Sequence, residues 1–251
     1  LRALTLPTID HRGPEFGVLG LEVQAGLQRI FQARHPVIIY PASGTGAWEG
    51  ALANTLSPGD AVLMFETGYF AAMWQKMALR LGLRPEFMGL VGTDAAGLPN
   101  GWRRGVQAEL IEQRLRADGG HQIKAVCVVH NETSTGVTSD IAAVRRAIEY
   151  LAFPRAGLAS ADYRHDEWGV DVSISGSQKG LMLPPGISFN ALSPKAIAAS
   201  HAARLPKAYW AWDEIIESNK GGYWPSTPNT NLLYGLAEAL QMLHEEGLPN
   251  V

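Results

Sequence analysis

Short apolar runs rich in β-branched residues alternate along this chain with stretches of helical period. The candidate strands are "PVIIY" (36–40), "AVLMF" (61–65), "AVCVV" (125–129) and "VDVSIS" (170–175). The candidate helices cover 18–34, 46–56, 69–82, 104–117, 139–151 and 232–246. Strands that are apolar on both faces and separated by helices are typical of a mainly parallel sheet. The sequence therefore predicts a three-layer α/β/α fold.

Charge and cysteine content narrow the function classes. The chain has 21 basic and 24 acidic residues spread along its 251 positions, so we expect no nucleic-acid partner. Its single cysteine, Cys127, lies in an apolar run, which excludes an internal disulfide and a cysteine zinc site. We predict no metal site. No window approaches the ~20 apolar residues of a membrane span. We therefore expect a cytoplasmic protein with no membrane partner.

The residues that follow the first predicted strand form a small-residue turn, "PASGTGAWEGALANTL". In a parallel sheet, ligands bind beyond the carboxyl ends of the strands. Backbone N–H groups at the helix start and the hydroxyls of Ser43 and Thr45 make a phosphate cradle there, and Gly44 permits close approach. An alternative is that Gly44 and Gly46 only shape a tight turn and that Ser43 caps the helix.

The same turn also imitates a dinucleotide-binding fingerprint. "GTGAWEG" follows a strand, and the next strand is followed by Glu66, which is suited to hold a ribose hydroxyl. The spacing is one residue too long, so we expect the third glycine to face away from the strand. A nicotinamide-dependent oxidoreductase stays an alternative on this basis.

Lys179 follows the fourth predicted strand, within "SISGSQKGLM" (173–182). Its neighbours are small or polar: Ser175, Gly176, Ser177, Gln178 and Gly180. The polar neighbours can bond a phosphate or a ring oxygen, and the glycines leave room for a planar cofactor. A lysine that is desolvated in such a niche becomes a carbonyl nucleophile, which is the chemistry of a pyridoxal phosphate Schiff base.

Three segments, "SGSQKGLMLPPGISFNALS", "HNETSTGV" and "TIDHRGPEF", carry a family resemblance. Through them the chain resembles the class V, fold-type I pyridoxal-phosphate aminotransferases, in particular the serine–glyoxylate and alanine–glyoxylate enzymes. The likeness runs from about Pro7 to Leu243. It implies an enzyme that transaminates a small amino acid, serine or alanine, with glyoxylate as amino acceptor, in two half-reactions on pyridoxal 5′-phosphate.

The resemblance also implies roles for residues. Lys179 matches the lysine that bonds covalently to the cofactor, and Gln178 matches a neighbour that contacts the cofactor phosphate. The matching phosphate-binding turn is Ser43, Gly44 and Thr45. Phe70 matches the aromatic residue that stacks on the pyridine ring, whereas Trp74 on the same predicted helix suits the core. Thr133 matches a residue that hydrogen-bonds near the ring hydroxyl.

Quaternary and domain organisation follow from the same likeness. Thr227 and Trp224 match positions that reach the partner's cofactor phosphate, which implies a homodimer with shared active sites. We expect a cofactor-binding large domain over 1–228. The segment 229–251 is then the start of a helix that leads to a truncated carboxy-terminal small domain, which in the family supplies an arginine for the substrate carboxylate.

One segment departs from the family pattern. The family has a strand that ends in Val-Asp, and its aspartate pairs with the pyridine nitrogen of the cofactor. Here the large domain is shortened near 149–157, Phe153 stands at the matching position, and Pro154 disfavours a central strand. We therefore expect the strand and its acid to be missing. A catalytically impaired remnant of such an enzyme is the second hypothesis.

Overall fold

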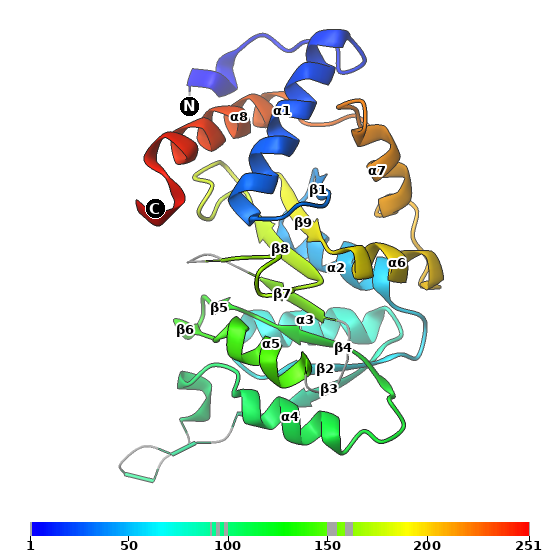
Figure 1. Ribbon diagram of the computed structural model, residues 1–251, viewed down its shortest axis with the longest axis vertical. Coiled ribbons are helices and arrows are strands. Elements are labelled where there is room, and N and C mark those ends of the chain that lie inside the picture. The colour runs from blue at the N-terminus through cyan, green and yellow to red at the C-terminus, as the bar shows by residue number, and fades with distance from the viewer. Residues whose placement is uncertain are drawn as a thin grey trace.

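One seven-stranded sheet organises the molecule. The structure is a computed structural model that describes residues 2–90, 92–93, 96–97, 100–149, 155–158 and 163–250. The strands lie in the order β1-β9-β8-β7-β4-β2-β3 (Figure 1). They are β1 (Val37–Tyr40), β2 (Ala61–Phe65), β3 (Arg84–Met88), β4 (Ile123–Val128), β7 (Arg155–Leu158), β8 (Val172–Gly176) and β9 (Ser188–Leu192). A separate hairpin consists of β5 (Asn131–Glu132) and β6 (Val137–Thr138).

The sheet is mainly parallel, as predicted. The strand pairs from β3 across to β8 are all parallel, and β9 runs antiparallel to β1 and β8. The four predicted strands are confirmed within two residues at each end. The strands β3 and β9 were not predicted. Arg84 and Glu86 interrupt the first, and Asn190 interrupts the second, so neither is a continuous apolar run.

Helices cover both faces of the sheet and bury two apolar clusters. One cluster contains residues of α1 (Pro14–Phe31), α4 (Ala108–Arg116), α5 (Ile141–Glu149) and α8 (Thr230–Glu246). The other contains residues of α2 (Gly44–Thr55), α3 (Tyr69–Arg80), α6 (Pro194–Ala202) and α7 (Trp212–Asn219). Short 3-10 helices lie at Arg2–Thr5, Gly101–Arg103 and Leu248–Asn250. The three-layer α/β/α architecture is therefore confirmed; α6 and α7 are additions to the predicted helices.

The expectation of a missing central strand is wrong. The strand β7 pairs in parallel with β4 on one side and β8 on the other. Four residues extend over about 13 Å, which is enough for one row of pairing on each side. The sheet is therefore continuous through the shortened segment. The positions of Phe153 and Pro154 lie outside the described residues.

The helix α8 packs along α1. Leu233, Leu236 and Leu240 of α8 are buried in the same cluster as Val23 and Leu27 of α1, and Figure 1 shows the two helices side by side. The predicted boundary at residue 228 stays a prediction. Among the described helices none is both long and apolar enough to cross a membrane.

The single cysteine has the structural place that the sequence predicted. Cys127 is 3% exposed within β4, between neighbouring strands of the sheet. Burial raises the pKa of its thiol to about 12, so the thiolate is not available near neutral pH. We assign Cys127 to the core.

Candidate active site

The carboxyl edge of the sheet brings two predicted loops together. Tyr40 at the end of β1 and Gly176 at the end of β8 both pair with Ser188, the first residue of β9. The turn that contains Ser43 and the loop that contains Lys179 therefore leave the sheet on either side of one strand. Strands are spaced about 4.8 Å apart, so the two strand ends lie about 10 Å from each other.

The turn after β1 is an open helix start. Ser43 is the N-cap of α2 in an extended conformation, and its side chain makes no cap hydrogen bond. The amides of Gly44 and Thr45 stand in the first turn, where the helix itself offers no acceptor. A Cβ atom on Gly44 would meet nothing within 4 Å, so the space in front of it is open. These features fit a phosphate group better than a closed structural cap.

The third glycine of the imitated fingerprint corrects one expectation. Gly50 is buried, and a Cβ atom there would lie 2.8 Å from the hydroxyl oxygen of Tyr40 on β1. It therefore faces the strand, contrary to prediction, and lets α2 lie close to β1. Glu66, the acid of that alternative, is exposed after β2.

Backbone hydrogen bonds close the loop that contains Lys179, but the lysine itself is exposed to solvent. Met182 N donates to Lys179 O at 2.9 Å and Lys179 N donates to Gly176 O at 3.3 Å, which closes the turn. The residues Gln178 and Lys179 are exposed. The expected desolvation of Lys179 is therefore not provided by the single chain. A bound cofactor or a second subunit would have to cover the amine.

Two neighbours of Lys179 have structural duties that were not expected. The Ser177 hydroxyl donates to Pro184 O at 2.7 Å and closes the loop, so it is not directed at a ligand. A Cβ atom on Gly176 would lie 2.7 Å from Gln178 Oε1. The room at Gly176 is thus occupied by the Gln178 amide rather than left for a ring.

Phe70 and Thr133 lie beyond two adjacent strands, β2 and β4. Phe70 is half-buried in the first turn of α3, with its ring 6.4 Å from that of Trp48 and inclined at 70°. Thr133 is exposed in the turn between β5 and β6. Trp74 is 1% exposed and belongs to the core, as predicted. The site therefore presents a partly exposed aromatic ring and a hydroxyl at the same edge as Lys179.

The segment with Trp224 and Thr227 borders the same edge. Trp224 Nε1 donates to Ile39 O in β1 at 3.3 Å, and its ring packs 5.7 Å from that of Phe16. Trp224 is thus anchored within its own chain, and Thr227 is exposed. Both line a hollow of about 470 Å³ together with His11 and Arg12.

The aspartates near the shortened segment lie at the opposite edge. Asp166 accepts from Arg34 N at 3.0 Å, before β1, and Asp171 precedes β8 and accepts from Ser193 Oγ at 2.9 Å. Burial raises the pKa of Asp171, and the bond from Ser193 only partly offsets this. Neither side chain is near the pyridine site that the resemblance implies. Asp162 lies outside the described residues.

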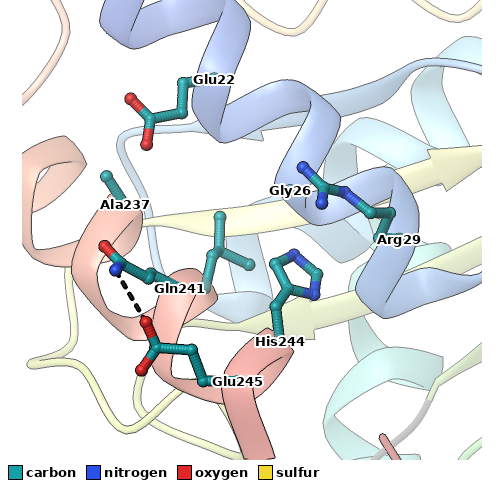
Figure 2. Close-up of a pocket in the computed structure, with 8 residues that line it drawn as sticks. Glu22, Gly26, Arg29, Ala237, Gln241, His244 and Glu245 are labelled. Carbon is teal, nitrogen blue, oxygen red and sulfur yellow. Dashed lines mark hydrogen bonds between the residues drawn. The ribbon is translucent and has the colours of Figure 1, made fainter. Parts of the chain in front are cut away.

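A second hollow, of about 320 Å³, lies between α1 and α8 (Figure 2). Its polar side chains include Arg29 and His244, and Gln241 Nε2 donates to Glu245 Oε1 at 2.8 Å. Burial lowers the pKa of His244, with Arg29 acting in the same direction. The lining residues come from helix faces and include no predicted site residue, so we do not assign the hollow to the active site. Within the described ranges, no three acidic, histidine or cysteine side chains are grouped to hold a metal.

Sequence reasoning missed two residues of the site. Glu132 is 1% exposed directly beneath Thr133, and Trp48 is 5% exposed beside Phe70. Glu132 lies within "HNETSTGV", but besides Ser134 it bonds the amides of Phe70 and Ala71, which lie 62 and 61 residues earlier in the chain. No local pattern could have identified them.

Comparisons with known proteins agree with this geometry. The family described as Aminotransferase class-V matches residues 7–251. The chain is 43% identical to the serine–glyoxylate aminotransferase of Methylorubrum extorquens and 40% identical to the L-aspartate–glyoxylate aminotransferase of Paracoccus denitrificans. All of this chain is aligned in both, but it spans 63% of the length of each. The solved alanine–glyoxylate aminotransferase from Nostoc sp. superposes with a TM-score of 0.88 at 28% identity, over 99% of this chain and 65% of that one.

Proposed function

Because this chain belongs to the class V aminotransferase family, we propose that it transaminates a small amino acid, serine or alanine, with glyoxylate as amino acceptor. The family implies pyridoxal 5′-phosphate as cofactor. One observation carries the proposal: the strand ends Tyr40 and Gly176, three residues before Ser43 and Lys179, pair with the same residue of β9. This supports a reactive amine and a phosphate-binding turn at one edge of the sheet.

The position of each residue suggests which part of the cofactor it would contact. The Ser43–Thr45 turn would hold the phosphate, and Gln178, which follows β8 on the other side of β9, would contact it. Phe70 would lie against the ring face, and Thr133 near the ring hydroxyl. When bound, the cofactor supplies an aldehyde and an electron-withdrawing ring. Lys179 Nζ would hold the cofactor covalently through its aldehyde carbon, and the same amine would be the base that moves the α-proton of the substrate.

We further propose a homodimer with shared sites. Two large apolar side chains, Tyr69 and Met182, are 63% and 62% exposed, and each lies within three residues of a predicted cofactor contact. Exposed apolar groups at the rim of a site favour cover by another surface. A second copy would also remove Lys179 from water and would bring Thr227 to its partner's phosphate.

The two alternatives are less well supported. The family match disfavours a nicotinamide-dependent oxidoreductase. The impaired remnant rests on the shortened sequence at 149–157, where no carboxylate stands at the position that the family pattern gives to the acid. Loss of a charge-assisted bond to the ring nitrogen would cost about 1.5–3 kcal/mol of cofactor affinity, so the remnant would bind the cofactor weakly and turn over slowly.

The test is to incubate the purified chain with pyridoxal phosphate, reduce it with borohydride and map the adduct by mass spectrometry. We expect a pyridoxyl group on Lys179 and none in Lys179→Ala. Lys195→Ala is the matched control, because Lys195 is also an exposed lysine but begins α6 at the opposite edge of the sheet. An adduct spread over many lysines, or one retained in Lys179→Ala, would contradict the proposal.

The same preparation separates the enzyme from the remnant. Visible absorption of the bound cofactor is recorded before and after addition of serine or alanine. A spectral change that glyoxylate reverses supports transamination. A cofactor spectrum that stays unchanged when either amino acid is added favours the remnant.

A further inference from the structure

Glu132 is a buried carboxylate between the two elements that would contact the cofactor ring. It ends β5 and is 1% exposed. The next residue is Thr133, and the first turn of α3, with Phe70, lies against its side chain. An acid buried to this degree requires strong hydrogen bonds, and Glu132 has several.

The carboxylate binds both elements at once. Its Oε2 accepts from Ala71 N at 3.1 Å, and Oε1 is 3.4 Å from Phe70 N. On the other side, Oε1 accepts from Ser134 N at 3.1 Å and from Ser134 Oγ at 2.7 Å. Ser134 Oγ in turn accepts from Tyr69 N at 2.8 Å. Three successive amides of the α3 start are thus held from the β5–β6 turn.

The helix start explains why a charged side chain is suited to this place. The first amides of a helix have no acceptor within the helix, and its N-terminus carries a partial positive charge that favours an anion. The backbone approaches closely to make these bonds: a Cβ atom on Gly68 would lie 2.7 Å from Glu132 Cγ. A glycine therefore lets α3 begin directly against Glu132.

The ring of Phe70 is supported independently of its backbone. Trp48 packs against it, and the Trp48 ring is itself stacked on that of Trp74, with centroids 5.5 Å apart and an angle of 19°. These tryptophans limit where the ring can go, but they do not fix the start of α3. The backbone at Phe70 and Ala71 is instead bonded by Glu132.

We propose that Glu132 is a positioning residue that sets Phe70 and Thr133 at one spacing for the cofactor ring. It touches neither cofactor nor substrate and acts through the two residues that would. The inference rests on the proposed function, because it assigns Phe70 and Thr133 to the ring. Loss of the carboxylate leaves the α3 amides and Ser134 without their acceptor, so the ring site widens and the cofactor is held less well.

The test compares Glu132→Gln and Glu132→Ala with Asp118→Asn. Asp118 is a matched control, since this buried carboxylate accepts from Gln122 N at 3.0 Å and Ile123 N at 2.9 Å at the amino end of β4, across the sheet from the site. Two readouts are used: hydrogen exchange of the Phe70 and Ala71 amides in the cofactor-free protein, and the dissociation constant for pyridoxal phosphate measured by tryptophan fluorescence.

For Glu132→Gln we expect the exchange rates of the Phe70 and Ala71 amides and the dissociation constant for pyridoxal phosphate each to rise about tenfold or more. The glutamine side chain keeps the shape of glutamate but lacks its charge and one of its acceptor oxygens. Glu132→Ala should show a larger rise wherever it folds. Asp118→Asn should lower the melting temperature about as much as Glu132→Gln does. It should leave the amide exchange rates and the dissociation constant at the wild-type values.

The outcomes separate this inference from the proposed function. Unchanged exchange and unchanged affinity in Glu132→Gln contradict the inference, whatever the melting temperature. Equal changes of exchange and affinity in Asp118→Asn would mean that Glu132 contributes only to the overall stability of the chain, which also contradicts the inference. A wild-type chain that does not bind pyridoxal phosphate contradicts the proposed function, and with it the cofactor part of the inference. A wild type that binds while the Glu132 variants bind equally well contradicts the inference alone.

Discussion

At the scale of single residues, burial decides which polar groups are available for chemistry. Lys179 is exposed, whereas His165 is fully buried beside Ser173, with 2.5 Å between His165 Nδ1 and Ser173 Oγ. Tyr163 bonds the same hydroxyl. Burial lowers the pKa of His165, and the acids Asp166 and Asp171 only partly oppose it. The imidazole of the folded chain is therefore neutral near pH 7.

His165 makes stability depend on pH. Its unfolded pKa is about 6.5 and its folded pKa is lower, so below pH 6.5 the unfolded chain binds more protons. The His165 contribution is complete above pH 6.5. It is lost as the pH falls toward the folded pKa, by about 1.4 kcal/mol for each pH unit that separates the two pKa values. Urea unfolding between about pH 5.5 and 7.5 should show this slope in the wild type and a flatter one in His165→Gln.

Asp171 acts with the opposite sign. Burial raises its pKa above the usual 3.8, so its contribution to stability falls as the pH rises from 3.8 through its folded pKa, whereas the contribution of His165 grows with pH. Parallel pH slopes for the wild type and His165→Gln would show that His165 is not the titrating group.

At the scale of elements, α1 is positioned by close backbone contacts as well as by its apolar face. A Cβ atom on Gly20 would overlap the carbonyl oxygen of Gly222, and one on Gly222 would overlap that of Gly17. Gly222 also has a φ of +81°, which disfavours other residues. The turn after α7 can therefore lie directly on α1, and it leads into the Trp224–Thr227 segment at the site.

We expect Gly20→Ala to lower the free energy of unfolding by about 3 kcal/mol or more, because a backbone carbonyl cannot move aside cheaply. Gly119→Ala is the control, since a Cβ atom at that exposed glycine would meet nothing within 4 Å. It should change the free energy of unfolding by less than about 0.5 kcal/mol. Equal midpoints for the two variants in urea unfolding would disprove the close contact.

At the scale of the whole molecule, the single chain does not enclose its candidate site. The carboxyl edge of the sheet presents Lys179, Thr133 and Ser43 to solvent, with Tyr69 and Met182 exposed beside them. A site built for a cofactor that must be kept from water is complete only when this edge is covered. The proposed homodimer would do so, and sedimentation should give twice the mass of the 27.1-kDa chain.

Mixed dimers test whether the sites are shared. Lys179→Ala and Thr227→Ala chains are each expected to bind pyridoxal phosphate poorly. A dimer with one chain of each kind has one site in which both residues are intact, if Thr227 serves the partner's site. Co-expression should therefore restore a borohydride-reducible adduct on the Thr227→Ala chain. Without restoration, Thr227 acts in its own subunit or not at all.

Local signals in the sequence determined the elements and the chemistry. Apolar runs of β-branched residues predicted β1, β2, β4 and β8, because strands buried on both faces need no partner to be recognised. The post-strand positions of Ser43 and Lys179 predicted a site at the carboxyl edge, since parallel strands end there together. The strand β3 was missed because its edge position tolerates charge.

Only the tertiary structure decided how these parts meet. The antiparallel β9 sets Tyr40 and Gly176 in register, Glu132 joins Phe70 to Thr133, and Ser177 closes its loop instead of facing a ligand. The register and these hydrogen bonds depend on which residues meet in the folded chain. Periodicity and motif spacing do not predict such contacts, because hydrogen bonding and solvent exposure are properties of the folded chain.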